Sequence, residues 1–218
     1  APAQAELIAA AADEVLSSKL DGNFPLVVWQ TGSGTQSNMN MNEVLANRGN
    51  QIAAERGVEL ERPLHPNDSV NMSQSSNDTF PTAMHVAAAT AVRERLLPAI
   101  AELKATFARL EEKNAGVVKC GRTHLQDAVP IAFSQEISGW RSSLERDAEL
   151  LRLAVKPLYE LALGGTAVGT GLNAPKGFSE LVAKKAAELT GKPFVTAPNK
   201  FHALTSKDEL VFAHGAIK

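Results

Sequence analysis

Three short polar runs hold most of the side chains in this sequence that are able to do chemistry. They are Ser33–Asn38, Ser73–Asp78 and Gly121–Asp127. The first two concentrate hydroxyl and amide groups just before a predicted helix, where backbone N–H groups and the positive end of the helix dipole add to them. That combination suits a carboxylate or a phosphate. Plain N-capping is the simpler interpretation of Ser33–Asn38. Ser73–Asp78 has more donors than capping needs, which favours an anion site there over a solvated loop.

The third run contains His124, which has the most reactive setting of the five histidines in the chain. It lies in a polar hinge between two apolar-striped segments, beside Thr123, and a helix is predicted to begin there. An imidazole held by hydrogen-bonding neighbours exchanges protons near neutral pH. His124 is therefore predicted to act as an acid or base. Cys120, the single cysteine, is interpreted as a small, partly buried side chain and not as a nucleophile.

Two further clusters have weaker signals. One mixes charges and polar groups in the residues Arg62, His65, Asn67 and Asp68. No recurring metal-ligand spacing is present there, so a surface anion pocket or a turn held by Asp68 is predicted. The other, Gly169–Ala174, fits a relaxed dinucleotide fingerprint. It follows a predicted helix and not a strand, so a tight turn is expected, with backbone N–H groups near a ligand as the weaker interpretation.

Composition limits the class of protein. The 218 residues are 44% hydrophobic and carry a formal net charge of −2, which argues against a nucleic-acid-binding or polybasic membrane-surface protein. One cysteine cannot form an internal disulfide or ligate an all-cysteine iron–sulfur cluster. No metal and no cofactor are expected, and a reducing, cytoplasmic location is predicted.

Apolar periodicity predicts an all-α architecture that positions the polar runs. Two long stripes with steps of three and four run from Met84 to Leu110 and from Phe133 to Leu158, with a kink expected at Pro98 in the first. Other predicted segments are helices over Ala3–Leu20, Asn38–Arg56 and Ser179–Leu189, a strand or buried extended segment over Phe24–Trp29, and loops over Arg62–Ser76 and Gly164–Gly171. The long stripes predict that part of their apolar surface is buried against other subunits.

Read together, the runs resemble class II fumarate hydratase of the fumarase/aspartase superfamily. The matching segments occur in the family's order and cover most of the chain: Trp29–Arg48, His65–His85, Gly121–Pro130 and Leu163–Asn173. Relatives that eliminate ammonia from aspartate typically have Gln at the position of His124 and Thr at the position of Ser76. These two residues therefore favour the hydratase.

The resemblance implies a long-helix bundle with a smaller, mainly helical N-terminal region. It divides the chain into residues 1–76, part of an N-terminal domain, and residues 77–218, the first part of a central helical-bundle domain. It also implies metal-independent, reversible hydration of fumarate to L-malate by a homotetramer whose active sites are shared between subunits. The location would be the cytoplasm, or the mitochondrial matrix in a eukaryote.

The resemblance assigns roles to residues. Ser33, Thr35, Asn38, Ser75, Ser76, Asn77 and Thr123 would bind the substrate, and Thr123 and His124 would serve the water side, with His124 moving the proton. Arg62, His65, Asn67 and Asp68 match the family's second, non-catalytic anion site.

The sequence departs from the family in its extent. It covers about the first half of the expected chain, and the family's serine-bearing flexible loop, with its Lys and Asn, is not among the 218 residues. The chain by itself is therefore predicted to be inactive. Two alternatives remain: a sister lyase acting on aspartate or another succinyl compound, and a non-catalytic, oligomerising helical scaffold.

Overall fold

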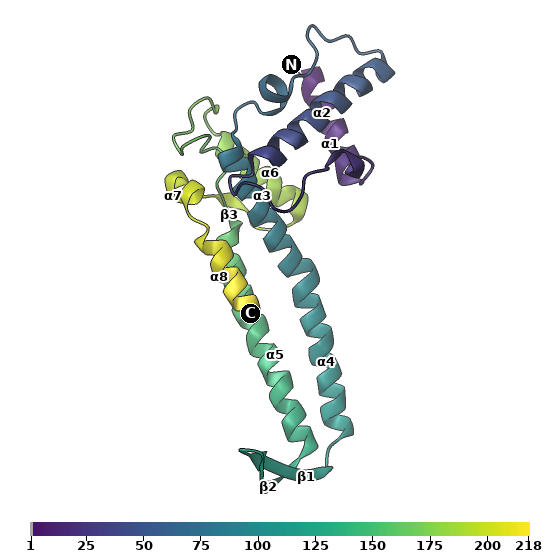
Figure 1. Cartoon of the computed structure of the whole chain (residues 1–218), viewed down its shortest axis with the longest axis vertical. Helices are drawn as coiled ribbons and strands as arrows, with labels where there is room; N and C mark the ends of the chain where they lie inside the picture. Colours follow the sequence, from purple (N-terminus) through teal and green to yellow (C-terminus); the bar gives the residue numbers. More distant parts are fainter. Residues whose placement is uncertain (1) are drawn as a thin grey trace. The chain divides into compact units, whose positions relative to one another are not determined.

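The computed structural model describes residues 2–218, and helices dominate it (Figure 1). The all-α prediction is confirmed. Two compact units are present. The first comprises the residues up to Met84 together with Glu160–Ser206, and the second comprises His85–Tyr159 together with Lys207–Lys218. The first unit is thus built from two stretches of sequence. The domain boundary after residue 76 stays a prediction.

Two helices and their connections form the N-terminal part of the first unit. They are α1 (Pro2–Leu16) and α2 (Thr35–Arg56), with a 3₁₀ turn, η1 (Asp21–Asn23), between them. Apolar side chains spaced along one face of each helix pack together with Leu64, from the loop after α2, in a buried core: Leu7, Ala11, Ala46, Ile52, Ala53 and Leu64. The first helix ends four residues earlier than predicted, at Leu16, whose side chain is exposed.

The segment Phe24–Trp29 corrects a prediction. It is neither a strand nor buried: Val28 and Trp29 are 91% and 92% exposed. A run of β-forming, apolar residues becomes a strand only when a neighbouring strand or a core accepts it, and the described residues of this unit provide neither at this place.

Arg48 joins α1 to α2 through a bidentate ion pair. Its guanidinium donates to both carboxylate oxygens of Glu14, at 2.7 and 2.9 Å, and also to Glu55 at 2.7 Å. The hydrogen bond from Arg48 is the main reason why the pKa of Glu14 lies below its usual value.

We predict that Arg48→Met lowers the melting temperature at neutral pH and that this loss shrinks in acid. A lowered folded-state pKa contributes stability above the unfolded pKa of the carboxyl group, and that contribution is lost as the pH falls through the folded pKa. Thermal unfolding of both proteins across the acidic range measures the difference. Lys185→Met, which removes an exposed pair with Glu188, is the control and should change little. A loss that is constant with pH would contradict the prediction.

The remainder of the first unit surrounds the start of α3 (Ser76–Ala91), a helix whose later residues belong to the second unit. The predicted loop before it contains a π turn, η2 (Pro66–Val70). The returning stretch provides helices α6 (Phe178–Thr190) and α7 (Lys200–Thr205), and two short parallel strands, β3 (Glu160–Leu161) and β4 (Val195–Thr196).

A helical hairpin forms most of the second unit (Figure 1). Its two arms are α4 (Leu97–Lys113) and α5 (Phe133–Val155), which pack side by side. The Phe107 and Trp140 rings lie 5.9 Å apart, and Arg141 donates to Glu111 at 2.7 Å. A 3₁₀ turn, η4 (Lys156–Tyr159), follows α5, and α8 (Asp208–Ile217) packs on α5. The second predicted apolar stripe is α5 with η4, and the first, from Met84 to Leu110, runs through the later part of α3 and a π turn into α4.

A kink was predicted at Pro98 itself. The structure instead has a π turn in the residues just before this proline. A π turn, η3 (Val92–Leu96), separates α3 from α4, and the Leu97 N–H donates to the Val92 carbonyl five residues back. Proline has no N–H and its ring crowds the carbonyl four residues before it. The wider π turn makes room for that carbonyl.

The predicted helix start at His124 is wrong. A β-hairpin joins the arms: β1 (Val118–Thr123) pairs antiparallel with β2 (Gln126–Ala132), and His124 and Leu125 form the turn between them. Both turn residues have positive φ, +49° and +62°, as a two-residue hairpin turn requires. The helix begins only at Phe133, nine residues after the histidine.

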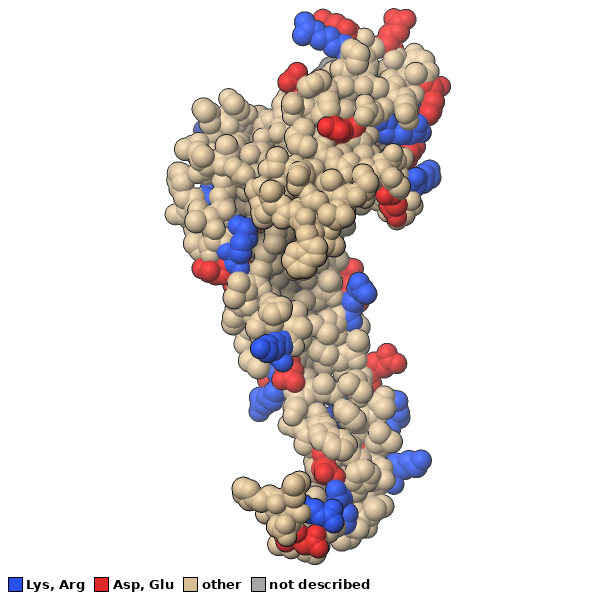
Figure 2. Space-filling model, viewed as in Figure 1, with Lys and Arg blue, Asp and Glu red and all other residues tan. Residues whose placement is uncertain are grey.

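Charges of both signs are interspersed over the face shown in Figure 2, and no patch of one sign covers a region of that face. None of the helices within residues 2–218 has both the length and the hydropathy of a membrane-spanning segment.

Candidate functional site

A pocket of about 360 Å³ in the first unit brings together two of the predicted segments. One wall is the run before α3, and the other is the glycine-rich loop that follows β3. The lining residues are Asn71, Ser73, Gln74, Ser75, Ser76, Thr166, Ala167, Val168, Thr170, Leu172 and Asn173. Hydroxyl and amide groups dominate this lining, which holds no charged side chain.

The start of α3 uses two side chains of its run for capping. The Ser75 hydroxyl accepts the Asn77 N–H at 3.2 Å, and the Asp78 carboxylate accepts the Ser75 N–H at 2.9 Å. This reciprocal pair satisfies backbone donors that a helix start leaves free. Ser73, Gln74 and Ser76, which this capping does not use, line the pocket together with Ser75 beside the helix start, where the dipole favours an anion.

Asp78 also holds the opposite wall. Its second carboxylate oxygen accepts the Gly164 N–H at 3.0 Å and the Thr166 N–H at 2.7 Å. The residue is fully buried, and burial raises the pKa of its carboxyl group, while the hydrogen bonds from Ser75, Thr166 and Gly164 act in the opposite direction. Nearby, the Leu163 N–H donates to the Thr82 hydroxyl at 2.9 Å.

Asparagine side chains connect the pocket to its surroundings. Asn77 donates to the Ala167 carbonyl at 2.8 Å. Asn71, in the pocket wall, accepts from the buried Asn38 and Asn42 of α2, at 3.0 Å each. The predicted ligand Asn38 therefore supports a pocket residue, Asn71, with one of its amide donors.

Ser33 and Thr35 lie in the same unit, at the start of α2, and are exposed. Their hydroxyls lie 3.3 Å apart, within hydrogen-bond distance. Gly34 between them has φ +69° and packs on Phe80 of α3, so closely that a Cβ would overlap the ring. The first polar run therefore contacts α3, the helix that begins at the pocket, through Gly34 and Phe80.

Thr123 and His124 belong to the second unit, so the structure does not assign them to this pocket. Both are exposed, at the tip of the β-hairpin. An imidazole that projects from such a tip is accessible to another molecule.

The second predicted anion site lies on one exposed stretch around η2. Arg62, His65, Asn67 and Asp68 are all exposed there. His65 Nδ1 accepts the Asp68 N–H at 3.3 Å and caps the π turn. The predicted turn thus exists, with His65 as its cap.

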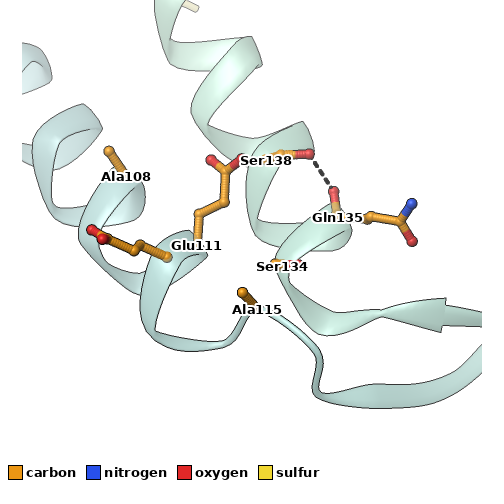
Figure 3. A pocket seen from close by; sticks show the side chains of 7 residues that line it. Ala108, Glu111, Ala115, Ser134, Gln135 and Ser138 are labelled. Carbon is orange, nitrogen blue, oxygen red and sulfur yellow. Dashed lines mark hydrogen bonds between the residues drawn. The ribbon is translucent and has the colours of Figure 1, made fainter.

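A second cavity, of about 420 Å³, lies in the second unit where α4 ends and α5 begins (Figure 3). Ala108, Glu111 and Ala115 face Ser134, Gln135 and Ser138, and Ser138 donates to the Gln135 carbonyl at 2.6 Å. Glu111 and Glu112 give this lining a negative charge, so it is a poor site for an anion.

Within residues 2–218 no three His, Cys, Asp or Glu side chains gather in a group suited to a metal ion.

The sequence analysis did not predict that Asp78 holds the glycine-rich loop through hydrogen bonds to its backbone. The runs were interpreted as ligand donors, whereas Asp78 binds N–H groups 86 and 88 residues further along the chain. A carboxylate in a run of donors, together with a distant glycine-rich loop, was the available signal.

The chain combines a helical hairpin with a polar pocket at the start of a helix. A family model described as lyase matches residues 1–218, so the chain belongs to this lyase family.

Within this lyase family, the similar proteins are named as one kind of enzyme. Proteins named class II fumarate hydratase from Bacillus anthracis and from Neisseria meningitidis serogroup A are 57% and 59% identical, over 99% and 100% of this chain. The match covers 46% and 47% of those proteins, so the chain spans about half the length of the curated relatives it matches. The resemblance stated from the sequence is confirmed.

Solved structures agree. A recombinant class II fumarase from Schistosoma mansoni superposes with a TM-score of 0.88 at 39% identity, covering 99% of this chain and 48% of that one. The fumarase-type all-α fold is therefore confirmed.

Proposed function

We propose that this chain is part of a fumarate hydratase, in which water adds across the double bond of fumarate to give L-malate. The observation that supports it best is the neutral, donor-rich pocket at the start of α3, in a chain whose relatives at 57% to 59% identity are named class II fumarate hydratase. The reaction adds a hydroxyl group to one carbon and a proton to the next, and L-malate loses both in the reverse direction.

The pocket residues suit the carboxylate side of this chemistry. When the proton beside a carboxylate is removed, negative charge develops on that carboxylate, and preorganised donors lower the barrier. Ser75 and Ser76, which line the pocket, and the adjacent Asn77, whose amide also donates to the Ala167 carbonyl, would supply those donors, assisted by the start of α3. Ser33, Thr35 and Asn38 would act from the neighbouring run.

Thr123 and His124 would serve the water side. An imidazole is suited to take or deliver a proton at neutral pH. In our proposal they reach a site through association of subunits in a homotetramer. The exposed apolar side chains of the second unit support that association: Leu103, Trp140, Leu150, Leu153, Val211 and Phe212 are all at least 45% exposed.

The proposal includes the inactivity of the 218-residue chain alone. The pocket lining has no Lys or Arg to hold the two charges of the substrate, and the lysine-bearing loop of the family is not among these residues. Without its cationic group and base, a site loses most of its rate enhancement. Arg62, His65, Asn67 and Asp68 are proposed as the second anion site, and the cytoplasmic location and the absence of a cofactor stay predictions.

The test compares the purified 218-residue chain with a full-length lyase that contains it. Loss of fumarate absorbance measures hydration, and release of ammonia from aspartate measures the sister reaction. We expect hydration by the full-length protein only. Hydration by the short chain would contradict its predicted inactivity. Ammonia release without hydration would replace the proposal by the sister lyase, and absence of both would favour the scaffold.

A further inference from the structure

Asp78 does not line the candidate pocket itself, but its carboxylate contacts both walls of the pocket and faces no solvent. Its side chain is fully buried, and both of its oxygens accept backbone N–H groups. One oxygen binds Ser75, at the start of α3, and the other binds Gly164 and Thr166 of the glycine-rich loop. This side chain therefore connects both walls of the pocket at Gly164 and Thr166, and Asn77 adds a neutral hydrogen bond to the next residue of the loop, Ala167.

The loop that Asp78 binds has little regular structure of its own. It contains turns and bends between β3 and α6. Gly164 has φ +98° and packs on Ser179, while a Cβ at Gly165 would lie 2.7 Å from Leu204. Backbone this close to its neighbours needs glycine, and glycine adds conformational freedom that other contacts must limit.

Two neighbouring contacts hold the entry to the loop. Thr82 accepts the Leu163 N–H, and the Lys200 ammonium donates to the Leu161 carbonyl at 2.7 Å. Within Gly164–Thr166, Asp78 supplies the acceptor for two of the three backbone N–H groups. Ionised acceptors bind N–H groups about twice as strongly as neutral ones, so the carboxylate is the main restraint on this part of the wall.

Burial of a carboxylate has a free-energy cost, which appears here as a raised pKa of the Asp78 carboxyl group. Thr166, whose N–H group Asp78 binds, lines the pocket together with the next two residues, Ala167 and Val168.

We propose that Asp78 is a positioning residue of the proposed active site: its buried carboxylate clamps the Gly164–Thr166 backbone to the start of α3 and so sets the separation of the two pocket walls. This inference rests on the proposed function for its catalytic consequence, but the clamp itself is a property of the described chain.

Amide hydrogen exchange, resolved to single residues, tests the clamp in the 218-residue chain. In the wild-type protein the Gly164 and Thr166 amides should exchange at least about 100-fold more slowly than in an unstructured peptide. Asp78→Asn keeps the shape of the side chain but turns an NH₂ group toward N–H donors. It should accelerate these two amides at least about tenfold, with amides of α2 and α5 unchanged.

Asp13→Asn, the same chemical change at an exposed position of α1, is the matched control and should leave the loop amides unchanged. Unprotected Gly164 and Thr166 amides in the wild-type chain would overturn the clamp, even if the Asp78 variant does not fold. Equal acceleration of all amides in Asp78→Asn, or no acceleration in the loop, would overturn it as well.

Kinetics of the full-length lyase separate this inference from the proposed function. If the pocket binds the dicarboxylate, Asp78→Asn should raise KM for L-malate about tenfold or more, with a smaller change in kcat, because a displaced wall mainly weakens binding. Loosened loop amides with unchanged KM and kcat would overturn the positioning role. A full-length protein without hydratase activity but with protected loop amides would contradict the proposed function and leave the clamp intact.

Discussion

His124→Asn in a full-length lyase that contains this chain is expected to reduce kcat for fumarate hydration by about 100- to 10,000-fold, the usual contribution of a positioned acid or base. The fold should be unaffected, because His124 is exposed at the tip of the β-hairpin. Its φ of +49° is in the left-handed region, and asparagine tolerates that region better than most residues. The substitution therefore removes the imidazole and keeps the turn. Initial rates of L-malate formation, with a thermal melt of each protein, measure both effects.

Leu125→Asn provides the matched control, because Leu125 occupies the second left-handed position of the same turn and is 92% exposed. It should keep most of the wild-type rate. Equal losses in both variants would show that the hairpin tip matters as a surface and not through its imidazole. An unchanged rate in His124→Asn would contradict a catalytic role of its imidazole.

The second large effect is expected at Gly34. Gly34→Ala should destabilise the chain by about 3 kcal/mol, since a side chain in the left-handed region costs about 1–2 kcal/mol and overpacking adds a similar amount. The added Cβ would overlap the Phe80 ring, and φ at this position is +69°. Chemical denaturation monitored by circular dichroism gives the free energy of unfolding.

Gly57→Ala separates the two causes. Gly57 ends the same helix with φ +64°, but no atom lies within 4 Å of a Cβ built there. It should lose only the backbone part, about 1 kcal/mol. If the two variants lost the same stability, the contact between Gly34 and Phe80 would be unimportant.

Predictions made from the sequence succeeded where one local pattern decides the structure. The stripe from Phe133 to Leu158 became α5 with its 3₁₀ extension. The helices predicted to end at Arg56 and Leu189 end there or one residue later, each followed by a glycine, Gly57 or Gly191, in the left-handed conformation. Apolar periodicity and glycine geometry are properties of neighbouring residues, so no tertiary contact is needed to read them.

The errors occurred where distant partners decide. The residues around His124 form a hairpin because Val118 pairs with Ala132 across the turn, and the helix signal begins only beyond that pairing. Phe24–Trp29 has the composition of a buried segment, yet exposed fractions of 91% and 92% at Val28 and Trp29 contradict burial. The candidate site followed the same pattern: the polar run before α3 and the glycine-rich loop were each predicted, but not the contact between them, which joins Asp78 to a residue 86 positions further along the chain.

The return of Glu160–Ser206 to the first unit also determines the order in which the chain can fold. Asp78 and Thr166 are 88 residues apart in sequence, so their contact requires closure of a long loop, which is slow. The arms α4 and α5 are joined by the short β-hairpin and can pair early, which shortens that loop. During synthesis we therefore expect the pocket to close only after the residues up to Asn173 have left the ribosome, whereas the core shared by α1 and α2 needs no residue of the returning stretch.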